Sequence, residues 1–166
     1  MTLVLFIGGV RSGKSSLAVE RATRAGRPVV FVATGEAGDE EMAARIEQHR
    51  RGRPEHWSTV EEPVELARAV AAAPGSNVLV VDCLSLWVAN VLEQDAVEDA
   101  AEEAARLAAA RPGLTIAVTN EVGLGIVPDN ELARRYRDVL GRVNAIWAAA
   151  AGEAYFVVAG RALRLE

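Results

Sequence analysis

Gly-Gly-Val-Arg-Ser-Gly-Lys-Ser, residues 8–15, is the most informative stretch of this chain. Its spacing, Gly8 followed after four residues by Gly13, Lys14 and Ser15, is that of a phosphate-binding P-loop. Glycines let backbone N–H groups approach phosphate oxygens, and the helix that follows adds the positive end of its dipole. We expect Lys14 to reach the β- and γ-phosphates of a nucleotide and the Ser15 hydroxyl to ligate Mg²⁺.

The residues on either side of this loop favour a true P-loop over a chance match. The apolar run 2–7 has strand length and enters the loop directly, and residues 16–22 can continue a helix after it. Strand, glycine loop and helix in that order is the context that the motif requires.

Apolar runs and helical stretches alternate along the rest of the chain. The expected strands are Leu3–Ile7, Pro28–Ala33, Asn77–Val81, Leu114–Thr119 and Ala154–Val158, with Arg161–Leu165 as a further short edge strand. The expected helices are Lys14–Ala25, Glu40–Arg51, Pro63–Ala72, Ala96–Ala110 and Asn130–Ala150. Continuous apolar strands are typical of a parallel sheet buried on both faces. The sequence therefore predicts one domain over residues 1–166, an α/β P-loop nucleotide-binding fold with a mostly parallel sheet and helices on both faces.

The last expected helix has the clearest amphipathic pattern. Its apolar residues recur at spacings of three and four, which gives one stripe: Leu132, Tyr136, Val139, Leu140, Val143, Ile146 and Trp147. Asp129 stands where an N-cap is expected, and Gly152 is a plausible stop after the helix.

Composition bounds the function. The net charge of −5 gives no reason to expect nucleic-acid binding. The single cysteine, Cys83, cannot form an internal disulfide, which fits a reducing cytoplasm. The apolar run before the P-loop is too short for a signal peptide or a membrane span. We therefore expect a cytoplasmic protein that does not bind nucleic acid and has no membrane span.

Asp82 ends an apolar run, Asn77 to Val81, that has the pattern of a strand. In P-loop enzymes an acid at such a strand end lies near Mg²⁺, directly or through water. The alternative is an aspartate that caps the segment beginning at Leu84. With a P-loop upstream, we favour the Mg²⁺ role.

Both histidines of the chain, His49 and His56, lie between Thr34 and Glu62. His49 shares a face with Met42 and Ile46 if this segment is helical, so packing on an apolar side is the plainer interpretation from the residues alone. Three arginines, Arg50, Arg51 and Arg53, follow, and such a cluster is usually a solvated turn. Beside a nucleotide, however, arginines bind phosphate, and a neutral imidazole can attack phosphorus.

Asn120 and Glu121 follow another expected strand and precede a glycine-rich turn. In an open α/β sheet the ends of such strands border the ligand crevice. From spacing alone, ligand contact by Asn120 and Glu121 is no better supported than the alternative, in which they start a polar loop and satisfy nearby backbone groups.

Four sequence blocks together resemble one known family, and the resemblance covers essentially the whole chain from about residue 3. The blocks are the P-loop, Asp39-Glu-Glu-Met-Ala-Ala-Arg-Ile46 with His49, Trp57-Ser-Thr-Val-Glu-Glu62, and Thr119-Asn-Glu-Val-Gly-Leu-Gly-Ile-Val-Pro128. The chain resembles the bifunctional adenosylcobinamide kinase / adenosylcobinamide-phosphate guanylyltransferase family. The P-loop is generic, whereas the last block and the Arg-Ile-x-x-His block are specific in combination.

The resemblance implies two reactions on a corrinoid. Adenosylcobinamide is phosphorylated with GTP or ATP, and GMP from GTP is then transferred to the phosphate through a GMP-histidine intermediate. The histidine of the Arg-Ile-x-x-His block is His49 here, and motif position ranks it before His56. The resemblance also implies a homo-oligomer, with a trimer as the candidate. A P-loop kinase of another small molecule and a non-enzymatic nucleotide switch are the competing hypotheses, but neither needs a histidine at position 49.

The implied nucleotide contacts carry over position by position. They are Gly8, Gly9, Val10, Arg11, Ser12, Gly13, Lys14, Ser15, Ala33, Thr34, Gly35, Arg50, Arg51, Gly52, Arg53, Glu61 and Asp82. Lys14 and His49 are the implied catalytic residues, and Ser15 and Asp82 the implied metal ligands. A carboxylate such as that of Glu61 can accept hydrogen bonds from guanine N1–H and N2–H₂, which adenine does not offer as a pair.

Overall fold

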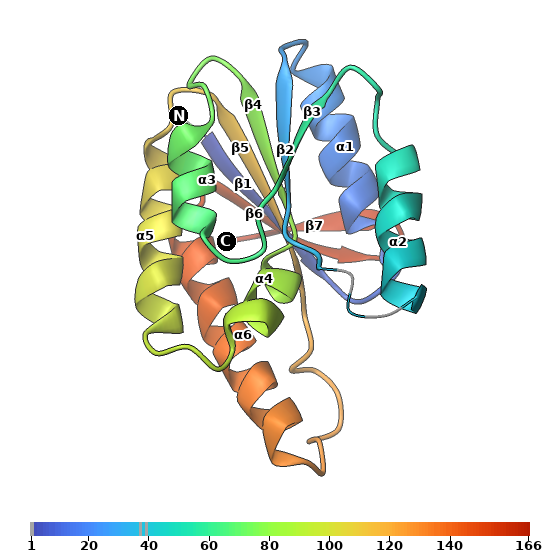
Figure 1. Ribbon diagram of the computed structural model, residues 1–166, viewed down its shortest axis with the longest axis vertical. Coiled ribbons are helices and arrows are strands. Elements are labelled where there is room, and N and C mark those ends of the chain that lie inside the picture. The colour runs from blue at the N-terminus through green and yellow to red at the C-terminus, as the bar shows by residue number, and fades with distance from the viewer. Residues whose placement is uncertain (1, 37, 39) are drawn as a thin grey trace.

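The computed structural model describes residues 2–166 except 37 and 39, and it leaves the side chains of residues 41, 42, 45 and 49 undescribed. A seven-stranded sheet forms the centre, in the order β3-β2-β4-β5-β1-β6-β7 (Figure 1). Its strands are β1 (Thr2–Gly8), β2 (Val29–Ala33), β3 (Ser58–Glu61), β4 (Val78–Asp82), β5 (Leu114–Asn120), β6 (Glu153–Val158) and β7 (Arg161–Leu165). β1 to β6 pair in parallel, and β7 returns antiparallel to β6.

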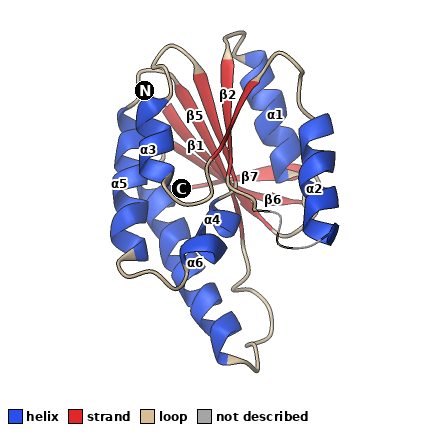
Figure 2. Ribbon diagram, viewed as in Figure 1, coloured by secondary structure: helices blue, strands red, loops and turns tan. Residues whose placement is uncertain are grey.

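Helices lie on both faces of the sheet (Figures 1 and 2). They are α1 (Lys14–Arg24), α2 (Glu40–Arg51), α3 (Leu66–Ala72), α4 (Leu84–Val91), α5 (Val97–Ala110) and α6 (Glu131–Ala150). α1 packs on one face, and α3, α4, α5 and α6 pack on the other. α2 lies beside α1, near the edge formed by β2 and β3.

Each central strand is buried on both sides. In β1, Leu3 and Leu5 face the α3–α6 cluster, whereas Val4 and Phe6 face α1. A strand between two helical layers needs an apolar residue at every position, and this explains why the runs are continuous rather than alternating. The predicted α/β fold with a mostly parallel sheet is confirmed, as are the five expected strands, the edge strand and the five expected helices.

Two elements were not predicted. β3 is exposed along its whole length and contains a single large apolar residue, Val60, so it carries no hydrophobic signal. α4 is a short buried helix with apolar residues at most positions, and a run of that length does not distinguish a helix from a strand or a loop.

The ends of α6 differ from the prediction. Asn130, not Asp129, is the N-cap, because its Oδ1 accepts a hydrogen bond from the Ala133 N–H at 2.8 Å. Gly152 does not close the helix: Ala151 leaves it in an extended conformation, and the Gly152 N–H donates to the Leu3 carbonyl at 2.9 Å as the chain enters β6. Leu132 is exposed, so the buried stripe begins one turn later. Within the described part of the chain, no helix has the length and hydropathy needed to cross a bilayer.

Arg111 fastens the end of the sheet opposite the P-loop. Its buried guanidinium donates to the carbonyls of Ala73 at 2.6 Å and of Pro74 and Asn77 at 3.0 Å each. Burial lowers the pKa of this arginine. These carbonyls belong to the turn between α3 and β4, where the Pro74 carbonyl also accepts the Asn77 N–H at 3.0 Å.

We expect Arg111→Met to lower the free energy of unfolding by about 2–4 kcal/mol, because the side-chain volume is largely kept while three carbonyls lose a charged donor. Urea unfolding measures this. The matched control is Arg106→Met, since Arg106 pairs only with exposed Glu103 and should cost less than about 1 kcal/mol. Equal losses in the two variants would contradict the role assigned to Arg111.

Candidate nucleotide site at the carboxyl edge of the sheet

The P-loop leaves β1 at the carboxyl edge of the sheet and turns into α1. A Cβ on Gly8 would lie 2.4 Å from the Val157 carbonyl oxygen, so no larger residue fits there. Gly13 has φ +99° and occupies the N-cap position of α1, a conformation that glycine adopts at little cost. The motif glycines thus shape the loop, as the sequence predicts.

The turn between β6 and β7 braces the P-loop. The Gly160 N–H donates to the Ser12 carbonyl at 2.7 Å, and Gly160 also lies against Gly13. Ala159 and Gly160 both have positive φ, 51° and 73°, as in the tight turns that join antiparallel strands. This support was not predicted, although Ala-Gly between two strand-like runs is a hairpin signal.

Lys14 lies folded along the loop. Its side chain is buried, and Nζ donates to the Gly9 carbonyl at 3.0 Å. Burial lowers the pKa of Lys14, against the opposing attraction of Cys83 and Asp82. The buried Ser12 hydroxyl has no hydrogen-bond partner among the described residues. A phosphate oxygen would give the Ser12 hydroxyl a partner and could take the place of the Gly9 carbonyl at Lys14 Nζ.

Strand pairing brings the other predicted polar residues to the same edge. Ala33 is in register with Glu61 on one side and with Asp82 on the other. Gly8 is in register with Asn120, and the Glu121 N–H donates to the Gly8 carbonyl at 3.1 Å.

Asn120 and Glu121 therefore border the P-loop. The Asn120 carbonyl accepts from Asn144 Nδ2 at 2.9 Å. The Glu121 carboxylate accepts from the Gly123 N–H. The Glu121 side chain thus satisfies a nearby backbone group, and the role of both residues at the ligand crevice stays a prediction.

Thr34 ties the ends of β2 and β4 together. Its fully buried hydroxyl donates to the Cys83 carbonyl at 2.6 Å and accepts the Cys83 N–H at 2.9 Å, and its own N–H donates to the Asp82 carbonyl at 3.3 Å. The Thr34 hydroxyl therefore fixes the strand end that carries Asp82. The next residue, Gly35, packs against Leu86 and Ile46. Burial raises the pKa of the neighbouring Cys83 thiol to about 11.

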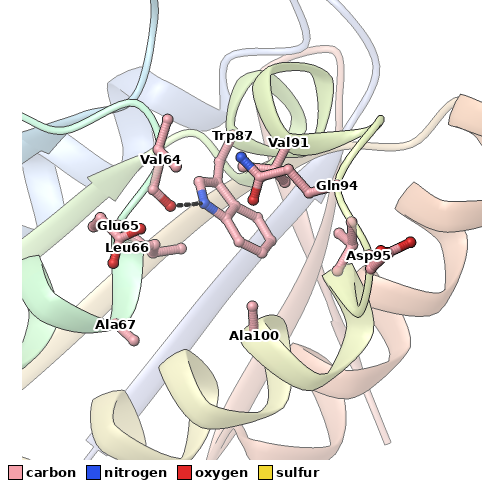
Figure 3. Close-up of a pocket in the computed structure, with 10 residues that line it drawn as sticks. Val64, Glu65, Leu66, Ala67, Trp87, Val91, Gln94, Asp95 and Ala100 are labelled. Carbon is pink, nitrogen blue, oxygen red and sulfur yellow. Dashed lines mark hydrogen bonds between the residues drawn. The ribbon is translucent and has the colours of Figure 1, made fainter.

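Asn90, on α4, joins this edge to the segment after β3. Its Nδ2 donates to the Thr34 carbonyl at 2.7 Å and to the Pro63 carbonyl at 3.0 Å. One helical turn earlier, Trp87 Nε1 donates to the Val64 carbonyl at 2.8 Å, beside a cavity of about 100 Å³ between α3, α4 and α5 (Figure 3). α4 thus positions the two segments on which Gly35 and Glu61 stand. An asparagine inside an apolar run was the available sequence signal, and it was missed.

A basic hollow of about 560 Å³ lies beside the last turn of α2. Its lining includes Arg50, Arg51 and Arg53 together with Glu47 and Glu55. The Arg53 guanidinium lies 3.7 Å from the centre of the Phe31 ring. Burial lowers the pKa of Arg53, while Asp82 and Glu61 oppose that shift.

Arg50 and Arg51 lie on the exposed surface of α2. Arg51 forms an exposed ion pair with Glu47 on its own helix.

The two histidines lie at the same end of α2. His49 falls in the last turn of the helix, and its side chain lies outside the described residues. His56 is exposed on the turn before β3. Because α2 runs back beside β2 from the carboxyl edge (Figure 1), residue 49 lies about 13 Å along the helix axis from its first residue. The structure does not bring position 49 against the P-loop.

Ser15 and Asp82 could hold Mg²⁺ only together with phosphate oxygens of a bound nucleotide. Among the described side chains, no three His, Cys, Asp or Glu residues gather as a metal site. Ser15 and Asp82 offer a hydroxyl and a carboxylate, and Mg²⁺ commonly binds one or two protein oxygens together with phosphates and water.

Comparison with known proteins settles the family. The family model described as cobinamide kinase / cobinamide phosphate guanyltransferase matches residues 4–165. This chain belongs to that family. The chain is 42% identical over 166 residues to the bifunctional adenosylcobalamin biosynthesis protein CobP of Pseudomonas aeruginosa, covering 98% of this chain and 96% of that protein. It is 41% identical over 181 residues to the bifunctional adenosylcobalamin biosynthesis protein CobU of Escherichia coli K12, covering 99% of each.

Solved structures support the fold of this cobinamide kinase / guanyltransferase family member. The chain resembles the KaiC-like protein PH0186 of Pyrococcus horikoshii with a TM-score of 0.57 and 18% identity, covering 93% of this chain and 70% of that one. The flagellar accessory protein FlaH of Methanocaldococcus jannaschii gives a TM-score of 0.57 and 16% identity, covering 99% and 78%. At such identities the likeness concerns the fold alone.

We expect Asn90→Leu to weaken GTP binding about tenfold, because the exits of β2 and β3 lose the side chain that joins them. Fluorescence titration with GTP measures this, with urea unfolding in parallel. The control is Asn77→Ser, since the Asn77 side chain lies on the opposite edge of the sheet and bonds only Ser76. A stability loss in Asn90→Leu with unchanged GTP affinity would show that Asn90 supports the fold but not the site.

Proposed function

We propose that this chain, as one domain over residues 1–166, phosphorylates adenosylcobinamide with GTP or ATP. It then transfers GMP from GTP to adenosylcobinamide phosphate, giving adenosylcobinamide-GDP and pyrophosphate. Membership of the family and full-length similarity to proteins named bifunctional support both activities. The observation that carries the proposal is a P-loop whose Lys14 shares one sheet edge with Asp82 and Glu61.

The kinase step depends on position and charge. Backbone amides of the P-loop and the ammonium of Lys14 would hold the phosphates and stabilise charge that develops on them during transfer. Mg²⁺, held through Ser15 and Asp82, would add positive charge to the same oxygens. The bracing of Ser12 by Gly160 keeps the loop in shape before nucleotide arrives, which lowers the cost of ordering it.

Two strand ends supply the nucleotide contacts beyond the loop. Ala33 and Gly35 lie at the exit of β2, and Glu61 ends β3. The exposed Glu61 carboxylate can accept both guanine N–H groups. Thr34 contributes indirectly, by holding β2 against β4.

The guanylyl step uses His49 as nucleophile. Its neutral imidazole attacks the α-phosphorus of GTP, a P–N bond forms, and the P–O bond to pyrophosphate breaks. A phosphate oxygen of adenosylcobinamide phosphate then attacks the same phosphorus and releases the imidazole. The basic hollow beside the last turn of α2 supports this location, because Arg50, Arg51 and Arg53 there can neutralise phosphate charge.

We propose a homo-oligomer, with a trimer as the candidate, acting in the cytoplasm, where nucleoside triphosphates are available. The outer strand β7 supports self-association, because it is an exposed sheet edge that carries Leu163 and Leu165.

We expect His49→Ala to abolish covalent labelling of the protein by α-phosphate-labelled GTP, because no imidazole remains to take GMP. Kinase activity should remain within about tenfold of the unaltered protein. The measurement counts protein-bound label after denaturation, and label on histidine is acid-labile and alkali-stable. His56→Ala is the matched control and should label normally. Loss of label in His56→Ala with normal labelling in His49→Ala would reverse the assignment.

We expect Glu61→Gln to reduce the preference for GTP over ATP by about tenfold or more, because one acceptor oxygen is replaced by an amide that repels guanine donors. Initial rates of acceptor phosphorylation with each nucleotide measure the ratio. Glu20→Gln is the control, since Glu20 is an exposed residue of α1 paired with Arg24. An equal fall with both nucleotides would argue against guanine recognition by Glu61.

A further inference from the structure

The two most exposed large apolar side chains of the described residues lie on one projecting segment. We call residues 122–132 the apolar arm, which comprises the loop after β5 and the start of α6. Ile126 is 97% exposed and Leu124 80%, and three further members are also exposed: Val122, Val127 and Leu132. In Figure 1 this segment extends beyond the rest of the molecule, at the bottom of the view. Apolar side chains grouped in this way mark a surface that something covers.

The apolar arm begins at the phosphate site. The residue just before it, Glu121, donates its N–H to the Gly8 carbonyl at 3.1 Å, and Asn120 pairs with Gly8 in the sheet. Val10, within the P-loop, is 70% exposed. A ligand whose reactive end lies at the P-loop therefore has the arm within reach of its remaining surface.

The arm is held in place at its base. Arg134 Nη1 donates to the carbonyls of Pro128 at 2.9 Å and Asp129 at 2.8 Å, and Asn130 caps α6. At the other end, Gly123 is bonded to the Glu121 carboxylate. These polar contacts fix the backbone and leave the apolar side chains turned toward solvent.

We propose that the apolar arm is the docking surface for the corrin ring of the acceptor, and this rests on the proposed function. The acceptor alcohol lies at the end of a short side chain of a bulky ring that carries many methyl groups. When that alcohol is at the γ-phosphate, the ring must lie on protein surface next to the P-loop. The arm offers exposed apolar area and continues from Glu121, the residue that borders that loop.

The test compares a polar with a conservative pair of substitutions. Leu124→Asn with Ile126→Asn removes the apolar surface, whereas Leu124→Met with Ile126→Val retains most of it. We expect the polar pair to raise the KM for adenosylcobinamide in the kinase reaction at least about tenfold, and the conservative pair to change it less than about threefold. The KM for GTP, measured in the same assays, should stay within about twofold in both pairs.

Three readouts separate the outcomes. An unchanged KM for adenosylcobinamide in the polar pair would overturn the proposal. So would dissociation of an oligomer by the polar pair in analytical ultracentrifugation, since the arm would then be an interface between copies of this chain. Failure of the unaltered protein to phosphorylate adenosylcobinamide would instead remove the proposed function itself, and that result is obtained before any variant is made.

Discussion

Parallel pairing of β1 to β6 forces six strand ends onto one edge of the sheet, and every candidate site residue of the P-loop edge depends on this constraint. The register places Gly8 beside Asn120 and Ala33 between Asp82 and Glu61. Burial on both faces fixes that register, because a slip of one residue would exchange the side chains of the two faces. Hydrogen bonds from Thr34 and Asn90 then lock the ends of β2, β4 and the segment after β3 together.

Much of this was predictable because the signals are local. The P-loop is a contiguous motif, and buried parallel strands are continuous apolar runs, so β1, β2, β4 and β5 could be located within a residue or two. The position of Asp82 follows from the end of its strand. Family resemblance added what spacing does not supply, namely the two reactions and the rank of His49 before His56.

The remainder depends on contacts between residues distant in the chain. β3 carries no apolar pattern, and only pairing with β2 makes it a strand. The hydrogen bonds between the Thr34 hydroxyl and Cys83 join residues 49 positions apart, which the sequence does not reveal. The helical stripe predicts a buried Leu132, but α6 begins beyond the body of the molecule, where nothing in the described chain covers that face. Periodicity identifies a helix without stating how far its neighbours extend.

The central place of β1 has a consequence for biosynthesis. β1 is made early but pairs only with β5 and β6, and the P-loop that follows it rests on the turn at Gly160. During translation, this apolar strand has no sheet partner until β5, which begins at Leu114, has left the ribosome. Nucleotide cannot meet a finished P-loop before translation reaches β7. The growing chain therefore depends on late-made sequence to shield its first strand, and that interval is when chaperone capture or aggregation would compete with folding.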